Sequence, residues 1–109
     1  MSPRNDQGSG LDIARALMQK ERLRMIGFIK EGKKNISEIA DETRLDRATV
    51  SYHLSVLEGL GLVSSEYQML KAPHSKGKIG RYYKVNKSAL KRAFQAIEGL
   101  KDEMGSLTP

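Results

Sequence analysis

Ser51 and His53 are the residues whose types first suggest chemistry, because a hydroxyl beside an imidazole can act as a nucleophile and its base. The surrounding stretch has a helical pattern, however, and residues two apart on a helix point about 200° away from each other. The Gly-Lys-Ile-Gly stretch at 77–80 lacks both the spacing and the strand–loop–helix context of a phosphate-binding loop. The sequence therefore predicts that the chain is not an enzyme.

The histidines are also too few for a metal site. The chain has no cysteine and two histidines, His53 and His74, and neither has a second ligand residue at the usual spacing. We therefore expect no metal site and no cofactor. The nature of any effector ligand is left open by the sequence.

Apolar and polar residues separate onto two faces of the helix predicted at 47–60. Val50, Leu54, Leu57 and Leu60 recur at spacings of four, three and three, which is the inner stripe of an amphipathic helix. The opposite face carries short hydrogen-bonding groups rather than the long Glu and Lys side chains of an ordinary exposed helix. Such a face fits a DNA major groove, about 12 Å wide, and can contact base edges. The residues predicted to read bases are Arg47, Thr49, Ser51, Tyr52 and Ser55.

Other helices are predicted before this one. The stretch 21–31 is apolar over most of its circumference, as a central buried helix would be. Asn35 stands three residues ahead of Glu38, which is an Asn-headed capping box and predicts a short helix. Asp46 caps the following helix, and Gly61 lies just past its end, where a left-handed residue is expected. The short helix, the turn and the polar-faced helix form a helix-turn-helix pattern.

The segment after this pattern is predicted to be a β-hairpin. Strands are predicted at 62–70 and 79–85, where apolar and polar residues alternate. The loop between them, 71–78, contains Pro, Gly and three lysines. Such a wing can lie along a phosphate backbone, and a solvated surface loop is the alternative. The residues predicted to contact phosphates on the wing at 71–81 are Lys71, Lys76, Lys78 and Arg81, although Arg81 could instead pair within the protein.

The last helix, predicted at 87–104 after the capping residue Asn86, carries an apolar seam. Its apolar residues repeat at spacings of three, four, three and four, and Phe94 widens the seam. The seam could cover the chain's own core, but its length favours contact with a second copy. A short apolar stripe at 11–19 is predicted to join it. The predicted dimer residues are Leu11, Ala14, Leu17, Leu90, Ala93, Phe94, Ile97, Leu100 and Met104.

Length and charge limit the class of protein. The 109 residues suffice for one domain, predicted at 11–104 behind a flexible segment at 1–10. The net charge is +6, and residues 44–87 hold eight Lys and Arg against three Asp and Glu, a net of +5, which favours a polyanionic partner. No apolar run approaches the roughly 20 residues that span a bilayer, and no secretory signal is evident. We expect a cytoplasmic protein with no membrane partner.

The sequence resembles the ArsR family of bacterial and archaeal transcriptional regulators over most of residues 11–104. The resemblance rests on ERLRMIGFIKEG, on NISEIADETRLDRATVSYHLSVLEGLGLV, and on GRYYKV after the wing. It implies a dimer through the first and last helices and recognition by the helix at 47–60. The Cys-rich stretch and the paired Asp and His ligands of the family's metal sensors are missing here. The family's base-contacting positions correspond to Arg47, Thr49, Ser51 and Tyr52.

Together these features predict a mainly helical α+β fold with a small β-hairpin wing, a winged helix-turn-helix of four helices, two strands and a fifth helix. The predicted function is sequence-specific binding of double-stranded DNA at a palindromic operator by a homodimer that represses transcription. Two alternatives stay open: a winged helix that binds another protein, and a protein that coats DNA without reading its sequence. The positive charge across 44–87 favours DNA.

Overall fold

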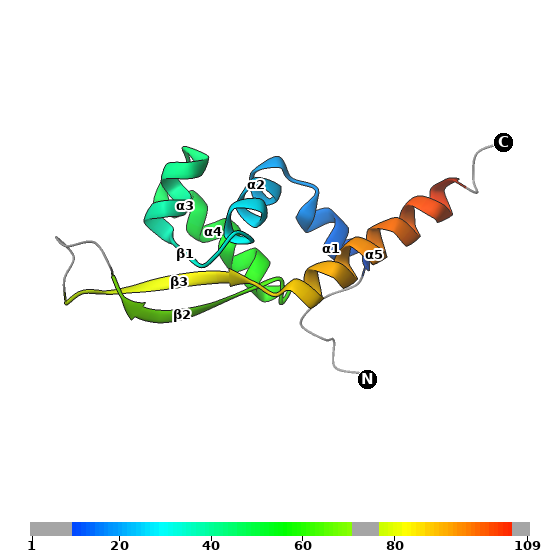
Figure 1. Cartoon of the computed structure of the whole chain (residues 1–109). Helices are drawn as coiled ribbons and strands as arrows, with labels where there is room; N and C mark the ends of the chain where they lie inside the picture. Colours follow the sequence, from blue (N-terminus) through cyan, green and yellow to red (C-terminus); the bar gives the residue numbers. More distant parts are fainter. Residues whose placement is uncertain (1–9, 71–76, 106–109) are drawn as a thin grey trace, which may run out of the picture.

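The computed structural model describes residues 10–70 and 77–105, which form five helices and one three-stranded sheet (Figure 1). The β-hairpin projects from one end of the body and the last helix from the other. Across this described part, no helix is both long and apolar enough to cross a membrane. In chain order the elements are α1 (Gly10–Leu17), α2 (Lys20–Ile29), β1 (Lys34–Asn35), α3 (Ile36–Thr43), α4 (Arg47–Gly59), β2 (Val63–Met69), β3 (Ile79–Val85) and α5 (Lys87–Gly105).

Local hydrogen bonds set the bounds of α3 and α4. The side chain of Asn35 accepts a bond from the Glu38 backbone N–H, and the Glu38 carboxylate accepts one from the Asn35 N–H, each at 2.8 Å. Asp46 accepts from the Thr49 N–H at 2.7 Å and begins α4. Gly61 follows the end of α4 with φ at +76°, the left-handed conformation that glycine adopts without strain. The predicted capping box, cap and terminal glycine are thus confirmed.

The sheet contains one strand that the sequence did not predict. The strands lie in the order β1-β3-β2, and both pairs are antiparallel. In the hairpin, Val63 lies opposite Val85 and Met69 lies opposite Ile79, so both predicted strands are present, with β2 one residue shorter at each end than the predicted 62–70. β1 adds Lys34 opposite Tyr83 and ties the start of α3 to the middle of β3. A two-residue strand has no periodicity of its own, which is why the sequence pattern could not reveal it.

The core lies among α2, α3, α4 and the first turns of α5. The prediction that α2 is buried over most of its circumference was wrong, because Leu23 is 41% exposed and the buried face is one stripe. Ala89 and Leu90 bring α5 onto the same core. The largest fully buried side chains are Leu17, Met25, Ile29, Ile39, Val50, Leu54, Leu57, Leu62 and Val63.

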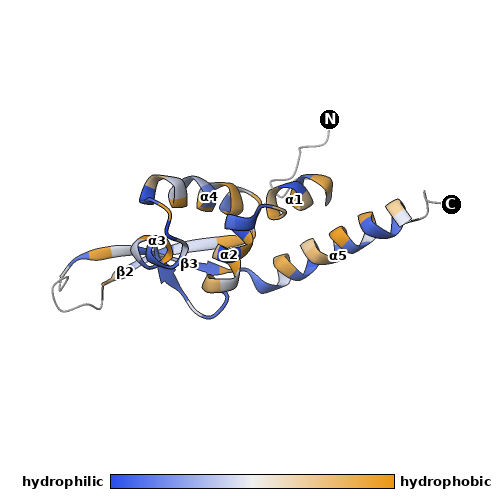
Figure 2. Ribbon diagram, turned by 90° about the horizontal axis from the view of Figure 1, so that it is seen from above, coloured by the Kyte–Doolittle hydropathy of each residue, from blue (hydrophilic) through white to orange (hydrophobic). Residues whose placement is uncertain are grey.

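α1 packs along α5, as the paired apolar stripes suggest. α1 ends at Leu17, two residues before the predicted end at 19, and α2 begins at Lys20. α5 reaches Gly105, and hydrophobic residues recur along its whole length (Figure 2). The flexible segment predicted at 1–10 lies outside the described residues up to position 9, and Gly10 is the first residue of α1.

Candidate nucleic-acid interface

The outer face of α4 is open to solvent and carries the residues predicted to read bases. Ser51, Tyr52 and Ser55 are exposed, and Tyr52 has 60% of its surface accessible. Thr49 is half-buried. The separation into two faces that the sequence predicts is therefore present, because the opposite face of the helix is fully buried through Val50, Leu54 and Leu57. That this face contacts DNA bases stays a prediction.

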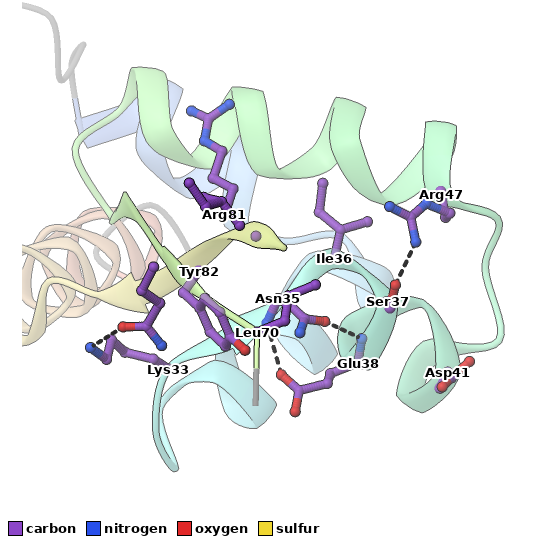
Figure 3. A pocket seen from close by; sticks show the side chains of 13 residues that line it. Lys33, Asn35, Ile36, Ser37, Glu38, Asp41, Arg47, Leu70, Arg81 and Tyr82 are labelled. Carbon is purple, nitrogen blue, oxygen red and sulfur yellow. Dashed lines mark hydrogen bonds between the residues drawn. The ribbon is translucent and has the colours of Figure 1, made fainter. Parts of the chain in front are cut away.

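Arg47 differs from the other predicted base readers because its side chain already has a partner. Its Nη1 donates to the Oγ of Ser37 in the first turn of α3 (Figure 3). Both residues line a hollow of about 670 Å³, which lies between the start of α3, the start of α4 and the loop end of the hairpin. Arg81 and Tyr82 of β3 line the hairpin side of this hollow. The Nη1 bond to Ser37 leaves the other N–H donors of this exposed guanidinium available for a base or a phosphate.

Hydrogen bonds fix the backbone around the exposed face of α4. The bond from the Thr49 N–H holds the pKa of Asp46 below its usual range, so the carboxylate that caps the helix stays ionised near neutral pH. One turn further on, the Ser55 hydroxyl donates to the Tyr52 carbonyl oxygen at 2.7 Å. The Ser55 oxygen can then accept a bond from a ligand, while the Ser51 hydroxyl has its donor free for one.

The residues predicted for the wing separate into two groups. Lys71 and Lys76 lie outside the described residues, and Lys78 is exposed just before β3. Arg81, in contrast, pairs within the protein: its Nη2 donates to Glu58 at 3.0 Å and its Nε donates to the Ser65 hydroxyl at 2.8 Å. Of the two roles that the sequence left open for Arg81, the structure shows internal pairing, and its contact with the phosphate backbone stays a prediction.

Glu66 of β2 also has positively charged partners, Lys33 and Lys84. Lys33, in the loop before β1, donates to the Glu66 carboxylate at 2.8 Å and to the Gln68 side chain at 3.1 Å. These contacts with Lys33, helped by Lys84 at 3.9 Å, lower the pKa of Glu66. Exposed pairs such as these contribute little to stability. Their main consequence is that Glu66 of β2 and Glu58 of α4 are each paired with a cation, Glu66 with Lys33 and Glu58 with Arg81.

A buried arginine under α4 was missed by the sequence reasoning. Arg22 of α2 is 4% exposed, and its Nε donates to the His53 Nδ1 at 3.0 Å while its Nη1 donates to the Ala16 carbonyl oxygen at 3.0 Å. Its guanidinium also lies 5.8 Å from the centre of the Tyr52 ring. Burial and the Arg22 charge lower the pKa of His53, although Glu21 partly opposes them. His53 is therefore a neutral acceptor that supports α4 from inside.

The predicted dimer residues lie partly within the chain's own core. Leu17, Leu90 and Ala93 are 0%, 5% and 1% exposed, so they offer little surface to a partner chain, and the expectation that they form an interface is corrected. Ala14, Ile97 and Leu100 are half-buried. The remaining members of the set are exposed, and their role in a dimer stays a prediction: Leu11, Phe94 and Met104.

The structure describes one of the two histidines. His53 is buried under α4, and His74 lies outside the described residues. Among residues 10–70 and 77–105, no group of three His, Asp or Glu side chains could hold a metal ion. The arrangement offers hydrogen bonding and positive charge, and the chemistry it supports is the recognition of a ligand.

Three solved structures are similar to this chain in fold. A possible transcriptional regulator for arsenical resistance gives a TM-score of 0.66 at 20% identity, covering 90% of this chain and 98% of that one. An ArsR-like transcriptional regulator from Rhodococcus sp. RHA1 gives 0.63 at 18% identity, with 89% and 83% covered. The homodimeric winged helix-turn-helix DNA-binding domain of a possible ArsR-family regulator from Mycobacterium bovis gives 0.59 at 22% identity, with 94% and 92% covered.

At such identities these likenesses show the fold, which is the predicted winged helix-turn-helix. No curated protein matches the sequence. The family model described as bacterial regulatory protein, arsR family, matches residues 19–65, which run from the start of α2 through the helix-turn-helix into β2. The chain is therefore similar to the arsR family of bacterial regulatory proteins over residues 19–65, and its fold is a winged helix-turn-helix.

Proposed function

We propose that the chain binds double-stranded DNA and represses transcription, with α4 as the recognition helix in the major groove. The observation that carries this proposal is the outer face of α4, where hydroxyl groups and one aromatic ring are exposed. The acidic residue of α4, Glu58, lies in its last turn and is paired with Arg81. The face therefore combines donors and acceptors for base edges with no unpaired carboxylate to repel phosphates.

Phosphate contacts are proposed for the wing and for the hollow beside it. Lys78 is exposed at the start of β3, and Lys71 and Lys76 belong to the same proposed set although they lie outside the described residues. Ser37 of α3 lines the hollow between α3, α4 and the hairpin, beside the proposed base reader Arg47. A strand of DNA beside the recognition helix passes over this side of the domain, so these groups supply affinity that does not depend on sequence.

A homodimer and a palindromic operator complete the proposal. Exposed apolar side chains of α1 and α5, such as Leu11 and Met104, supply surface for a second copy. The homodimeric state of the Mycobacterium bovis domain supports the same arrangement. A twofold dimer reads inverted half-sites about one helical turn apart, roughly 34–36 Å. A dimer bound across a promoter in the cytoplasm would block polymerase, which is the simplest route to repression.

Selection of bound sites from a random DNA library tests this proposal. We expect enriched duplexes with two inverted half-sites spaced by about 10–10.5 base pairs. Retardation of random DNA without any enriched sequence would contradict sequence reading and favour a DNA-coating protein. No retardation of any duplex at micromolar protein and low salt would contradict DNA binding and favour a protein-binding winged helix.

The variant Ser51→Ala tests whether α4 recognises the DNA sequence, and Ser64→Ala on β2 is the matched control. Both serines are exposed, so neither change alters the core. Ser51→Ala is expected to change the recovered sequence, whereas Ser64→Ala is expected to leave it as it is. The same recovered sequence from wild type and Ser51→Ala would remove this serine from the reading face.

A further inference from the structure

A second hollow, of about 420 Å³, opens between the end of α2 and the first turns of α5. Its floor is apolar, because it is formed by Leu90 and by the ring of Phe94, which is 44% exposed. Lys30, Lys87 and Lys91 stand at its rim. We propose that this hollow binds a small organic anion with a flat apolar body, of the class of aromatic carboxylates.

The spacing of the lining residues along α5 places charge directly beside the apolar floor. Lys87, Lys91 and Phe94 follow each other at intervals of four and three, so they share one face of the helix. Leu90 lies one turn before Phe94 and continues the floor into the core. Lys30, at the end of α2, brings a third ammonium group from a different element. A ring seated on Phe94 would thus have cations within reach on two sides.

The three lysines are available for such a ligand. In the part of the chain that the structure describes, none of their ammonium groups has a carboxylate within ion-pair distance. Glu98 is the one carboxylate among the lining residues, and it lies one turn beyond Phe94. The lining therefore carries three positive groups and one negative group around an apolar floor. Covering this floor with a ligand removes apolar surface from water, which is favourable.

A second copy of this chain is a poor occupant for the hollow. Twofold contact through this face would be self-complementary, so it would bring the lysines of one protomer against those of its partner. Like charges at an interface are unfavourable. A small anion, in contrast, neutralises the rim and covers the floor together. The charge of the rim thus favours the anion over a second copy.

The hollow also lies away from the face of α5 that α1 covers. Gly10 of α1 approaches Ala96 closely enough that an added methyl group would lie 3.4 Å from the Ala96 Cβ. Ala96 and Phe94 are two residues apart, so they point to nearly opposite sides of α5. No lining residue comes from α4 or from the described strands of the hairpin. A ligand here leaves both the proposed DNA face and the α1 side of α5 free.

Titration of the full chain with 2-naphthoate, and with the neutral analogue 2-naphthalenemethanol, tests the site without DNA. Exposed ion pairs contribute roughly two- to fivefold in affinity each. We expect naphthoate to bind once per chain and at least fivefold more tightly than the alcohol. The amide resonances of Lys30, Leu90 and Phe94 should shift on binding.

Three variants test whether the hollow between α2 and α5 binds the aromatic carboxylate through its lysines and Phe94. Lys87→Gln combined with Lys91→Gln should reduce naphthoate affinity to that of the alcohol, and Phe94→Ala should weaken both ligands. Lys101→Gln, an exposed change further along α5, is the matched control and should bind as wild type.

Equal affinity for acid and alcohol, or undiminished binding by the double lysine variant, would overturn the proposal. Loss of self-association in that variant, without any naphthoate binding by wild type, would assign the hollow to a second copy and overturn it as well. Because no outcome depends on DNA, failure here leaves the proposed regulator function intact.

Discussion

Replacing His53 by leucine should destabilise the domain through Arg22, because the imidazole is the acceptor for a buried guanidinium. The Arg22 Nε donates to the His53 Nδ1 at 3.0 Å, and Arg22 is 4% exposed. Leucine fills a similar volume but accepts no hydrogen bond. A buried donor left without a partner costs about 1–3 kcal/mol, and more when the group is charged. His53→Leu should therefore lower the free energy of unfolding by about 1–3 kcal/mol.

His53→Gln is the matched control for this prediction. A glutamine Oε1 can accept the bond from Arg22, so the cost should stay below about 1 kcal/mol. Urea unfolding followed by circular dichroism at one fixed protein concentration measures both variants, since the stability of a dimer depends on concentration. Equal destabilisation by leucine and glutamine would show that packing of the ring, rather than the bond to Arg22, is what matters.

The same pair predicts a pH dependence whose sign follows from the lowered pKa of His53. Burial and the Arg22 charge lower this pKa below its ordinary value of 6.5 in the folded chain, and Glu21 opposes them in part. As the pH falls below about 6.5, the unfolded chain therefore binds the proton first, and the free energy of unfolding decreases. Protonation also turns Nδ1 into a donor that faces the Arg22 N–H. Wild type should lose more stability than His53→Gln between about pH 8 and about pH 5, and equal losses would refute the reasoning.

Three further predictions concern the cap, the dimer and metals. Asn35→Ala removes the bond that the Asn35 side chain accepts from the Glu38 N–H but keeps the bond from the Asn35 backbone N–H to Glu38, and it should lower the free energy of unfolding by about 1 kcal/mol, measured by thermal melting against Asn86→Ala as a second cap variant. Ile97→Asp places a charge in the half-buried seam of α5 and should convert a dimer to monomers in sedimentation; a wild type already monomeric at tens of micromolar would contradict it. Zn²⁺ or Ni²⁺ at low micromolar concentration should leave DNA affinity unchanged, and stoichiometric release reversed by a chelator would reveal a metal site.

Features set by neighbours in the chain could be predicted from the sequence. Asn35 and Glu38 bond each other across three residues, and Asp46 bonds Thr49 across the same interval, so residue types at fixed spacing sufficed. Gly61 marked the end of α4 because a left-handed residue is required there. The buried and exposed faces of α4 could likewise be predicted, because its apolar residues recur at the spacing of a helix.

Features set by tertiary contacts could not be predicted. Arg22 lies on the stripe of Met25, Ile26 and Ile29, and that position was the one available signal that it is buried. Its partner His53 is 31 residues away in the chain, so no local pattern could join them. Arg81 likewise looked like a phosphate contact until its bonds to Glu58 and Ser65 were seen.

The seam of α5 shows why a repeat does not reveal its partner. The spacing of Leu90, Ala93, Ile97, Leu100 and Met104 is the same whether a residue covers the chain's own core or a second copy. In the structure Leu90 and Ala93 belong to the core, while Met104 is 67% exposed beyond the body of the domain. The exposed C-terminal end of the seam is thus the part that a second copy can contact.

The central claim is that α4 reads bases while the wing holds phosphates. It is tested most directly by the affinities of a selected duplex and a shuffled duplex for Arg47→Ala, Ser51→Ala and Lys78→Ala, over a range of salt concentrations. The α4 variants should reduce the difference in binding free energy between the selected and the shuffled duplex. The reduction should be about 1–3 kcal/mol where an arginine makes two hydrogen bonds to a guanine.

Lys78→Ala should instead weaken binding to both duplexes alike and reduce the salt dependence by about one unit of slope per lost contact per subunit. Loss of discrimination in Lys78→Ala, with the gap unchanged in both α4 variants, would contradict the account.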